Sequence, residues 1–477
     1  MRLRRFGFAS CSSALYDDRV RRFLPLLLAL TACARPATPT AQSTAPAPSV
    51  PLDDAFDIVA SLSTEVGPRL AGSAGDANAV AWATRTMTRL GLTGVRTEAV
   101  QVPVWRRGEE RATLVETNTS VAVTALGGSA ATPSSGVSAK VARVTSLDAV
   151  KDAADGAFAG RIVFFDVPTP RTKDGHGYGN GVLVRVLGPA LAARKGAVAV
   201  VVRSIGTDDG DAPHTGFVKD PDADAGVAPV PSAALSSLAS GTLAAALAQN
   251  PNLTLRLLLT PSKGADATSA NVLGEVPGRT SEVVLLAAHL DSWDLARGAV
   301  DDGAGVAIAL DAARAIQRRG IPRRTVRVVL FAAEENSGAG ARAYAAAHAA
   351  EPHAVATEAD LGCGAPYEVR WLSDSAHGAM LTPLGASLAA VGVVVSTEGA
   401  EGGSDVQPLR LLGVPLMDVR QDASLYFDVH HSKNDTLAAV DRSTLQRAAD
   451  VMATVAWYLA NVEGELGRVP TEQRTRR

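Results

Sequence analysis

Histidine and carboxylate side chains with the chemistry of metal ligands are concentrated in one stretch of the chain. His289 ends one apolar run, and Asp301 lies in the glycine-rich turn that follows. A second apolar run ends in Glu334 and Glu335, and two glutamates directly after a buried strand are costly unless they are paired or coordinated. One histidine with several carboxylates forms a set of nitrogen and oxygen ligands that suits Zn²⁺. The stretch therefore predicts a metal site, and a salt-bridged sheet edge is the alternative for the glutamate pair alone.

The elements that must position these groups form a predicted strand–helix–strand unit. The apolar runs 283–288 and 326–333 are short and bounded by turn signals, which indicates buried strands of a parallel sheet. Between them, apolar residues recur at helical spacing from Val306 to Ile316, and Gly320 ends the predicted helix. In open α/β sheets, sites are built at the carboxyl ends of the strands. We therefore expect the charged groups to meet at one edge of the sheet.

Motifs along the chain follow a recognisable order. They read His-Leu-Asp-Ser-Trp-Asp at 289–294, Gly-Ala-Val-Asp-Asp-Gly-Ala-Gly at 298–305, Ala-Glu-Glu-Asn at 333–336 and Phe-Asp-Val-His-His-Ser at 427–432. This order resembles peptidase family M28, a family of co-catalytic zinc exopeptidases, and within it the carboxypeptidase Q branch. The resemblance covers nearly all of residues 51–463. It implies an α/β fold, a phosphorylase/hydrolase-like zinc peptidase core in which a mixed central sheet is flanked by helices.

The resemblance implies two Zn²⁺ ions held by five side chains. Asp301 would bridge both ions. His289 and Asp360 would complete the coordination of one ion, and Glu335 and His431 that of the other. The peptide bond after the bridging aspartate is cis in this family, which implies a cis bond between Asp301 and the next residue.

Further roles around the ions follow from the same resemblance. Glu334 matches the family's general base, and Asp291 resembles the carboxylate that orients a liganding histidine. Asp405, at the end of a Gly-Gly-Ser-Asp turn, would brace the site from behind the ligands. His430 stands where related enzymes often carry a tyrosine that polarises the transition-state oxyanion. It either takes that role as a donor or packs behind the ligands.

Two of the ligand positions have a rival nearby. Glu358 is the alternative to Asp360. His430 is the alternative to His431, which we assign as the ligand because Ser432 and Asp435-Thr436 follow it in the family's spacing. We expect His176 and His214 in surface loops or loops that face substrate, with metal ligation as the alternative. The remaining histidines, His348, His353 and His377, lack a partner motif, and we expect them on the surface.

The function predicted from these residues is exopeptidase activity on short peptides or dipeptides through a metal-bound water. A glutaminyl-cyclase-like acyltransferase, which uses a single zinc on a related fold, is one alternative. A catalytically inactive binding protein on the same scaffold is another, although the chain keeps all five ligands and the base. The chain end attacked depends on which charged groups close the pocket. The sequence leaves the oligomeric state open; relatives form dimers, which makes a homodimer one candidate assembly.

The chain of 477 residues is too long for one ordinary core. We expect the peptidase core at 53–117 and 262–465. Short β-rich runs separated by Gly, Pro and Asp at 118–261 resemble an inserted protease-associated domain, whose motifs include Pro-His-Thr-Gly at 213–216. The polar, basic tail 466–477 is expected to be disordered.

The first fifty residues carry signals for export. Arg21 and Arg22 precede a short apolar run and then small residues, which is typical of a secretory signal. Leu-Thr-Ala-Cys at 30–33 resembles a lipobox, so residues 1–33 are interpreted as a signal in which Cys33 becomes lipidated; an ordinary cleaved signal is the alternative. Residues 34–52, rich in Pro, Ala, Thr and Ser, form a flexible linker. We expect a periplasmic or cell-envelope lipoprotein held at the membrane by this anchor, and otherwise a secreted protein.

The amino-acid composition limits the class of protein and the kind of binding partner. With 47% hydrophobic and 20% charged residues, the chain is typical of soluble globular proteins. The net charge of −3, without a dense basic patch, argues against a nucleic-acid partner. Cys363 is the only cysteine after the predicted signal, so the body of the protein has no internal disulfide.

Overall fold

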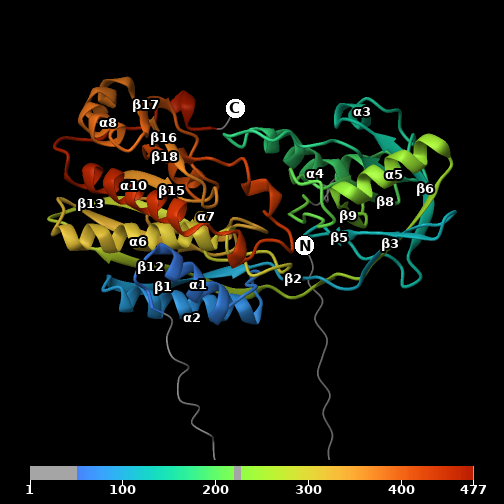
Figure 1. The fold of residues 1–477 in the computed structure, drawn as a ribbon, viewed down its shortest axis with the longest axis horizontal. Coiled ribbons are helices and arrows are strands. Elements are labelled where there is room, and N and C mark those ends of the chain that lie inside the picture. The colour runs from blue at the N-terminus through green and yellow to red at the C-terminus, as the bar shows by residue number, and fades with distance from the viewer. Residues whose placement is uncertain (1–50, 220–226, 476–477) are drawn as a thin grey trace, which may run out of the picture. The chain divides into compact units, whose positions relative to one another are not determined.

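The computed structural model describes residues 51–219 and 227–475. The predicted signal with Cys33, and nearly all of the predicted linker, lie outside these residues. None of the helices in the described part is both long and apolar enough to cross a membrane. The described strands form two eight-stranded sheets and one small two-stranded sheet (Figure 1).

The first sheet is mixed and carries the metal-site motifs. Its strands, in spatial order, are β1 (Thr93–Val102), β12 (Ala267–Val276), β14 (Arg324–Phe331), β13 (Thr280–His289), β15 (His353–Glu358), β18 (Leu416–Gln421), β16 (Pro366–Leu372) and β17 (Val394–Gly399). The central strand β13 runs parallel to both of its neighbours, β14 and β15. The outer strands β1 and β12 pair antiparallel to each other, and so do β16 and β18. The parallel sheet that was predicted for the two apolar runs is therefore confirmed as the centre of a mixed sheet.

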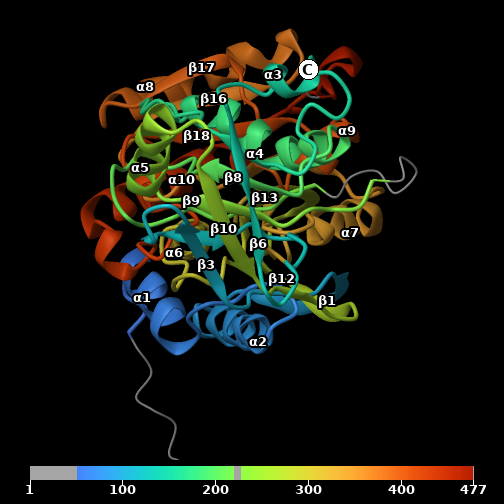
Figure 2. The same cartoon turned by 90° about the vertical axis from the view of Figure 1, so that its right-hand side faces the viewer.

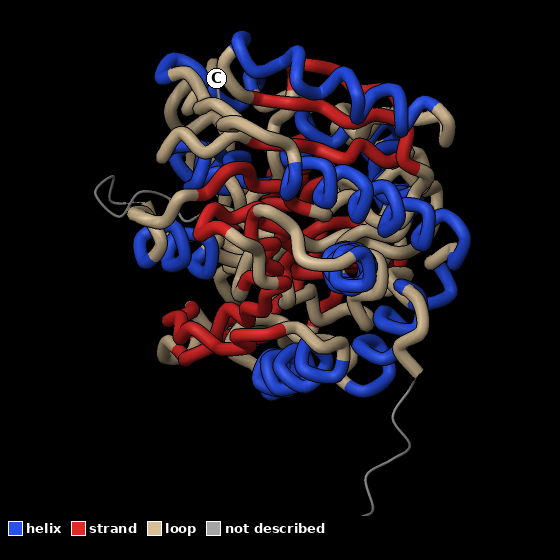
Figure 3. The backbone as a smooth tube through the Cα atoms, turned by 90° about the vertical axis from the view of Figure 1, so that its left-hand side faces the viewer, coloured by secondary structure: helices blue, strands red, loops and turns tan. Residues whose placement is uncertain are grey.

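Helices cover both faces of this sheet (Figure 3). Alternate residues of β13 show why: Val284, Leu286 and Ala288 belong to one apolar core, and Leu285 and Ala287 belong to another. A strand that is buried on both faces reads as a continuous apolar run, which is the pattern that the sequence has here. The helices of the first core are α1 (Ala55–Glu65), α2 (Ala74–Arg89), α6 (Gly303–Arg319), α8 (Thr382–Ala389) and α10 (Arg442–Asn461); those of the second are α7 (Ala339–Ala347) and α9 (Gln407–Leu411).

Helix α6 connects the two strands that deliver the metal-site residues. Asp302 caps its first turn, because a carboxylate oxygen accepts the Gly305 N–H at 3.0 Å. The helix ends at Gly320, which has a φ of 118°, and the predicted end of the helix is thus confirmed. A Cβ atom at Gly305 would lie 1.8 Å from the Ala359 carbonyl oxygen. Only glycine therefore lets α6 approach the end of β15 this closely.

The second sheet lies within residues 110–259. Its strands, in spatial order, are β4 (Thr119–Val121), β3 (Glu110–Leu114), β10 (Thr254–Leu259), β6 (Val137–Val144), β7 (Ile162–Phe165), β8 (Ala199–Arg203), β9 (Ser232–Leu235) and β5 (Val123–Ala125). It begins at β3, before residue 118, where we expected an inserted domain to start. The chain enters and leaves this part next to the small sheet formed by β2 (Trp105–Arg106) and β11 (Ser262–Lys263).

Helices also pack on the second sheet, so this part is not purely β-rich. Figure 2 shows α5 (Ser237–Gln249) and α4 (Gly177–Arg194) among its strands; a third helix, α3 (Asp148–Lys151), is one turn long. Leu243 of α5 shares an apolar core with Phe164 of β7, whereas Val184 of α4 shares another with Phe165. Helix α4 therefore packs on the sheet with one side, and other side chains of the helix line the cavity over the predicted metal site.

The tail differs from the disorder that we expected. Leu466 and Val469 are buried, and Val469 joins the core that contains α7 and α9. A short 3-10 helix follows at Thr471–Gln473, and the Arg474 side chain donates to the Val469 carbonyl oxygen at 3.0 Å. The prediction of disorder from the polar composition was wrong, because the two buried apolar side chains hold this segment against the domain that contains the first sheet.

Candidate metal centre

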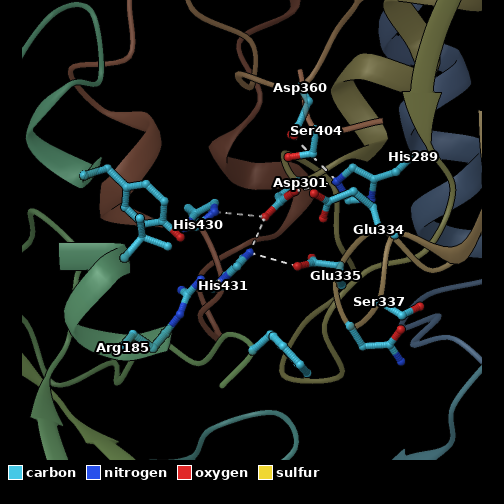
Figure 4. Close-up of a pocket in the computed structure, with 15 residues that line it drawn as sticks. Arg185, His289, Asp301, Glu334, Glu335, Ser337, Asp360, Ser404, His430 and His431 are labelled. Carbon is cyan, nitrogen blue, oxygen red and sulfur yellow. Dashed lines mark hydrogen bonds and ion pairs between the residues drawn. The ribbon is translucent and has the colours of Figure 1, made fainter. Parts of the chain in front are cut away.

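The predicted ligands come together at the carboxyl end of the parallel strands. His289 ends β13, Asp360 follows β15, and Glu334 and Glu335 follow β14. The parallel register pairs His289 with Phe331 of β14, so these strands end at nearly the same level. A cavity of about 540 Å³ opens over this edge and is lined by all of these side chains (Figure 4). The expected position of the site at one edge of the sheet follows directly from the parallel pairing.

Two groups of potential ligand atoms share Asp301. One Asp301 oxygen lies 3.1 Å from His289 Nε2, and an Asp360 oxygen lies 3.7 Å from the same nitrogen. The other Asp301 oxygen lies 3.2 Å from His431 Nε2, which is itself 3.0 Å from a Glu335 oxygen. The structure therefore gathers the same two sets of residues that the resemblance implied, one on each side of Asp301.

The donor set fits divalent metal. Asp301 Oδ2 and Glu335 Oε1 are buried and accept no hydrogen bond within the described part of the chain. Buried carboxylate oxygens without partners are costly, and a cation beside them removes that cost. Two imidazoles and three carboxylates match the ligands that zinc takes in co-catalytic sites.

Hydrogen bonds behind the ligands fix their orientation. The backbone carbonyl oxygen of Asp291 lies 3.1 Å from His289 Nδ1 and accepts its proton, which leaves Nε2 free to coordinate. The Asp291 carboxylate accepts the N–H groups of Glu334 at 3.0 Å and Glu335 at 3.3 Å. Asp291 thus orients His289 through its backbone carbonyl, whereas its carboxylate, 3.6 Å from the same ring nitrogen, holds the backbone of the two glutamates.

Two positioning residues were missed from the sequence. Asp302 caps α6 with one oxygen and accepts the His289 N–H at 3.1 Å with the other. Asp435 accepts the N–H groups of Val300 at 2.6 Å and Asp301 at 3.2 Å. Both fix the backbone of the turn that carries the shared aspartate. The peptide bond between Asp301 and Asp302 is cis, as the resemblance implied. For Asp302, a helix N-cap pattern was the available signal. Asp435 was part of the motif used to assign His431, but its hydrogen bonds to the distant turn at 300–301 were not predicted.

The structure brings both His430 and His431 to Asp301, and potential ligand atoms of the three residues lie within 4.8 Å of one another. His430 stacks on His431 with ring centroids 3.6 Å apart, and its Nε2 lies 3.4 Å from Asp301 Oδ2. Only His431 also reaches Glu335. Burial lowers the pKa of His430 well below its usual value, and the neighbouring His431 adds to this effect. A neutral His430 at the edge of the ligand set remains compatible with a donor role toward substrate.

Glu358 does not line the cavity. One of its oxygens accepts the N–H groups of Asp405 at 2.9 Å and Val406 at 3.3 Å, at the start of the segment leading to α9. Asp360, in contrast, reaches His289. Asp405 is buried behind Glu358, and its two carboxylate oxygens have no hydrogen-bond partner among the described residues. Because no hydrogen bond joins this carboxylate to a ligand among the described residues, the bracing role of Asp405 stays a prediction.

Burial dominates the electrostatics of the glutamate pair. Burial raises the pKa of Glu334 to about 8, and Asp360 adds to the rise while His289 opposes it. Burial also raises the pKa of Glu335 to about 7, again with a histidine, His431, opposing. Glu334 lines the cavity but takes part in neither ligand group, so its carboxylate faces the place where substrate would lie.

The other histidines are mostly buried, contrary to the prediction. His214 is 1% exposed and lies 2.8 Å from an Asp208 oxygen. His353 contacts the Tyr344 hydroxyl at 2.9 Å, and His348 contacts Glu351 at 2.7 Å. His176 is exposed, as expected. Each of these buried rings has a polar partner, and it is the packing of segments far apart in the chain that buries them.

Comparisons with known proteins place the chain among metallopeptidases. The model of peptidase family M28 matches residues 271–456. Carboxypeptidase Q of Mus musculus is 33% identical over 409 residues, which cover 84% of this chain and 85% of the relative. Carboxypeptidase Q of Homo sapiens is 31% identical over 419 residues, or 87% and 86% of the two chains.

Solved structures extend the likeness to the fold. The peptidase M28 precursor from Shewanella amazonensis SB2B has a TM-score of 0.84 and 42% identity, covering 87% of this chain and 95% of its own. BSAP, a zinc aminopeptidase from Bacillus subtilis, has a TM-score of 0.60 at 20% identity, covering 88% and 99%. The second likeness concerns the fold alone.

Proposed function

The chain belongs to peptidase family M28 and is a metallo-exopeptidase; on that premise we propose that it hydrolyses short peptides or dipeptides with two Zn²⁺ ions. The observation that carries the proposal is the arrangement around Asp301. Its two oxygens face two separate ligand groups, His289 with Asp360 and Glu335 with His431. A single-zinc site would need only one of these groups.

Each residue has a distinct task in the proposed reaction. Zinc in such a site supplies Lewis-acid polarisation of the scissile carbonyl and a more acidic water. Glu334 takes a proton from the attacking water as the new C–O bond forms. It then delivers that proton to the amine nitrogen as the C–N bond breaks. His430, held beside Asp301 at the edge of the ligand groups, donates to the oxygen on which negative charge develops.

The test begins with zinc counted per chain in the protein from residue 34 onward. Hydrolysis of unblocked, N-blocked and C-blocked dipeptides is then compared between wild type, Glu334→Gln and the control Glu398→Gln, an exposed position on the edge strand β17. We expect two zinc ions in all three proteins and loss of turnover in Glu334→Gln alone. Turnover that survives in Glu334→Gln would refute the general-base assignment.

The same experiment separates the alternative functions. One zinc per chain with cyclisation of N-terminal glutamine would support a glutaminyl-cyclase-like acyltransferase. Protein that binds no zinc and hydrolyses no peptide would support an inactive binding protein on this scaffold.

The proposal includes export and anchoring at the membrane. The basic pair, the short apolar run and Leu-Thr-Ala-Cys at 30–33 support lipidation of Cys33 and a place in the periplasm or cell envelope. Expressed in a bacterial host, the wild type should fractionate with membranes and Cys33→Ala should not. Equal fractionation of the two would argue for an unanchored protein. A homodimer stays a prediction, which light scattering of the purified protein tests.

A further inference from the structure

The segment that carries the two cavity histidines is bonded to the part of the chain that forms the second sheet. This histidine segment, residues 423–433, follows strand β18 of the first sheet. Within it, His431 has a φ of 59°, a left-handed backbone conformation that residues other than glycine seldom adopt. Such a conformation costs free energy and persists only where the surrounding contacts enforce it. Those contacts come from residues 110–259, called the second-sheet part below.

Thr215 of the second-sheet part contacts His431 with both of its backbone groups. The Thr215 N–H donates to the His431 carbonyl oxygen at 2.9 Å. The Thr215 carbonyl oxygen lies 3.3 Å from His431 Nδ1 and accepts its proton. The first bond fixes the backbone of the histidine. The second fixes the tautomer and the plane of the ring, which leaves Nε2 free to face Asp301 and Glu335.

An ion pair joins the same segment to the second-sheet part. Asp428 accepts from Arg171 with both carboxylate oxygens, from Nη1 at 2.9 Å and from Nη2 at 2.7 Å. The same guanidinium donates to the backbone carbonyl oxygens of Ser424 and Thr207. Thr207 in turn donates its N–H to the Phe427 carbonyl oxygen at 3.0 Å and its hydroxyl to Asp428 at 2.7 Å. The backbone that leads to the histidines is therefore held from the second-sheet part as well.

The Arg171–Asp428 pair is suited to fix a position and contributes little to the stability of the fold. Paired hydrogen bonds between a guanidinium and a carboxylate set the angle between the two groups as well as their distance. The side chains are 42% and 24% exposed, so solvent screens the pair and keeps its contribution to the free energy of unfolding small. Removing the pair should therefore leave the fold intact and change the position of the histidine segment.

The two ligand groups differ in how they are held. Figure 4 shows His289 and His431 on opposite sides of Asp301. His289 and Asp360 follow neighbouring parallel strands of the first sheet, and the acceptor of the His289 Nδ1 proton, the Asp291 carbonyl, lies in the same part of the chain. His431 instead takes its acceptor from the second-sheet part. Zinc affinity should therefore depend on that part at one ligand group and not at the other.

We propose that Arg171 and Asp428 are positioning residues for the zinc ion held by Glu335 and His431, so that this ion binds tightly only while the second-sheet part is bonded to the histidine segment. The proposal rests on the two-zinc function proposed above and adds what sets the affinity of one ion. Arg171 and Asp428 do not line the cavity and act through His431. Because the two equilibria are linked, zinc at this site must also stabilise the bonded arrangement.

The test measures zinc affinity, by competition with a chelator, in full chains that keep only one ligand group. His289→Ala retains Glu335 and His431, whereas His431→Ala retains His289 and Asp360. Arg171→Met is then added to each. We expect it to weaken zinc binding about 10-fold in the His289→Ala protein and to leave the affinity of the His431→Ala protein unchanged. Equal losses in both proteins, or no loss in either, would overturn the proposal.

Matched variants separate positioning from a general loss of charge. Arg442 is also a partly exposed arginine paired with aspartates, but it lies on α10 and does not line the cavity, so Arg442→Met in the His289→Ala protein should not change zinc affinity. Arg171→Lys should restore part of the lost affinity. Asp428→Ala should weaken zinc as Arg171→Met does, and the two changes together should cost no more than either alone, because they remove the same pair. Fully additive losses would refute the pair as the acting unit.

A second measurement decides if the proteins with one ligand group bind no zinc. Hydrogen exchange at the Thr207 and Thr215 N–H groups should slow when zinc is added to the wild type, because both groups donate to the histidine segment. Arg171→Met should need about 10-fold more free zinc for the same protection. An identical zinc dependence in the two proteins refutes the role of Arg171 and leaves the two-zinc function standing. A wild type that binds fewer than two zinc ions refutes the two-zinc function instead.

Discussion

Replacing Asp291 with asparagine tests how the site is held together. Asp291 is 1% exposed, and its two oxygens accept the N–H groups of Glu334 and Glu335 at 3.0 and 3.3 Å. One of these oxygens also lies 3.6 Å from His289 Nδ1. Asparagine has nearly the same shape but only one acceptor oxygen, so Asp291→Asn changes hydrogen bonding and charge with little change in packing.

The size of the effect follows from those contacts. The asparagine oxygen keeps one N–H bond, and its NH₂ group then faces the other N–H and leaves it unsatisfied. A buried donor without a partner costs about 1–3 kcal/mol, which corresponds to roughly a 5- to 150-fold change in an equilibrium constant. Because the affected backbone carries Glu335, we expect this loss to fall on zinc affinity, although the His289 ring keeps its bond to the backbone carbonyl oxygen of Asp291. Losses of this size are typical when a residue behind metal ligands is replaced.

The assay is zinc affinity from competition with a chelator of known strength. Asp294→Asn is the matched control: it is the same substitution three positions later, at a residue whose carboxylate pairs with Arg107 and not with the ligands. Asp291→Asn should bind zinc about 10- to 100-fold more weakly, and Asp294→Asn should bind it like wild type. Wild-type affinity in Asp291→Asn would refute the reasoning, because the glutamate backbone would then need no acceptor there.

Three further predictions concern stability. Asp302→Ala removes the cap of α6 and the acceptor of the His289 N–H, so urea unfolding should show a loss of about 2–4 kcal/mol; an unchanged midpoint would contradict this role. Chelation of zinc should lower the melting temperature and re-addition should restore it, since free zinc at 100 times its Kd adds about 2.7 kcal/mol to the free energy of unfolding. Equal melting curves with and without chelator would argue against zinc in the buried ligand set. Burial lowers the pKa of His353 in the folded protein to about 4, below the ordinary value of a histidine. As the pH falls, the unfolded chain therefore takes up a proton at this histidine before the folded protein does. The free energy of unfolding should then fall by about 2 kcal/mol between pH 6.5 and 5. His353→Gln should lose less over the same range, and the same loss in both proteins would show that other groups titrate.

The centre of the fold could be predicted from local sequence. The apolar runs 283–288 and 326–333 correspond to strands β13 and β14, and the helix predicted between them corresponds to α6. Strands buried on both faces must be apolar throughout, and a helix packed on one side must repeat its apolar residues at helical spacing. These patterns are properties of each segment by itself, so they are visible without the rest of the chain.

The ligand groups were also accessible from the sequence. His289 and Glu335 are fixed by where their strands end, since parallel strands in register bring their carboxyl ends to one edge. The bridging position of Asp301 came from the resemblance, and the structure agrees in setting its two oxygens toward two groups. His430 and His431 offered the same chemistry in the sequence, and motif spacing favoured His431. The geometry then showed that, of these two histidines, only His431 reaches Glu335.

Tertiary structure alone decided the rest. The order at 466–475 depends on Leu466 and Val469 finding a core built by distant segments. His348 and His353 are buried because Glu351 and Tyr344 give them partners. Arg185 meets His431 across 246 positions, and Gly216 makes the room for that contact. Local spacing encodes which face of a strand or helix is buried; which charge ends up opposite which ligand depends on how segments far apart in the chain pack together, and no short window of sequence contains that information.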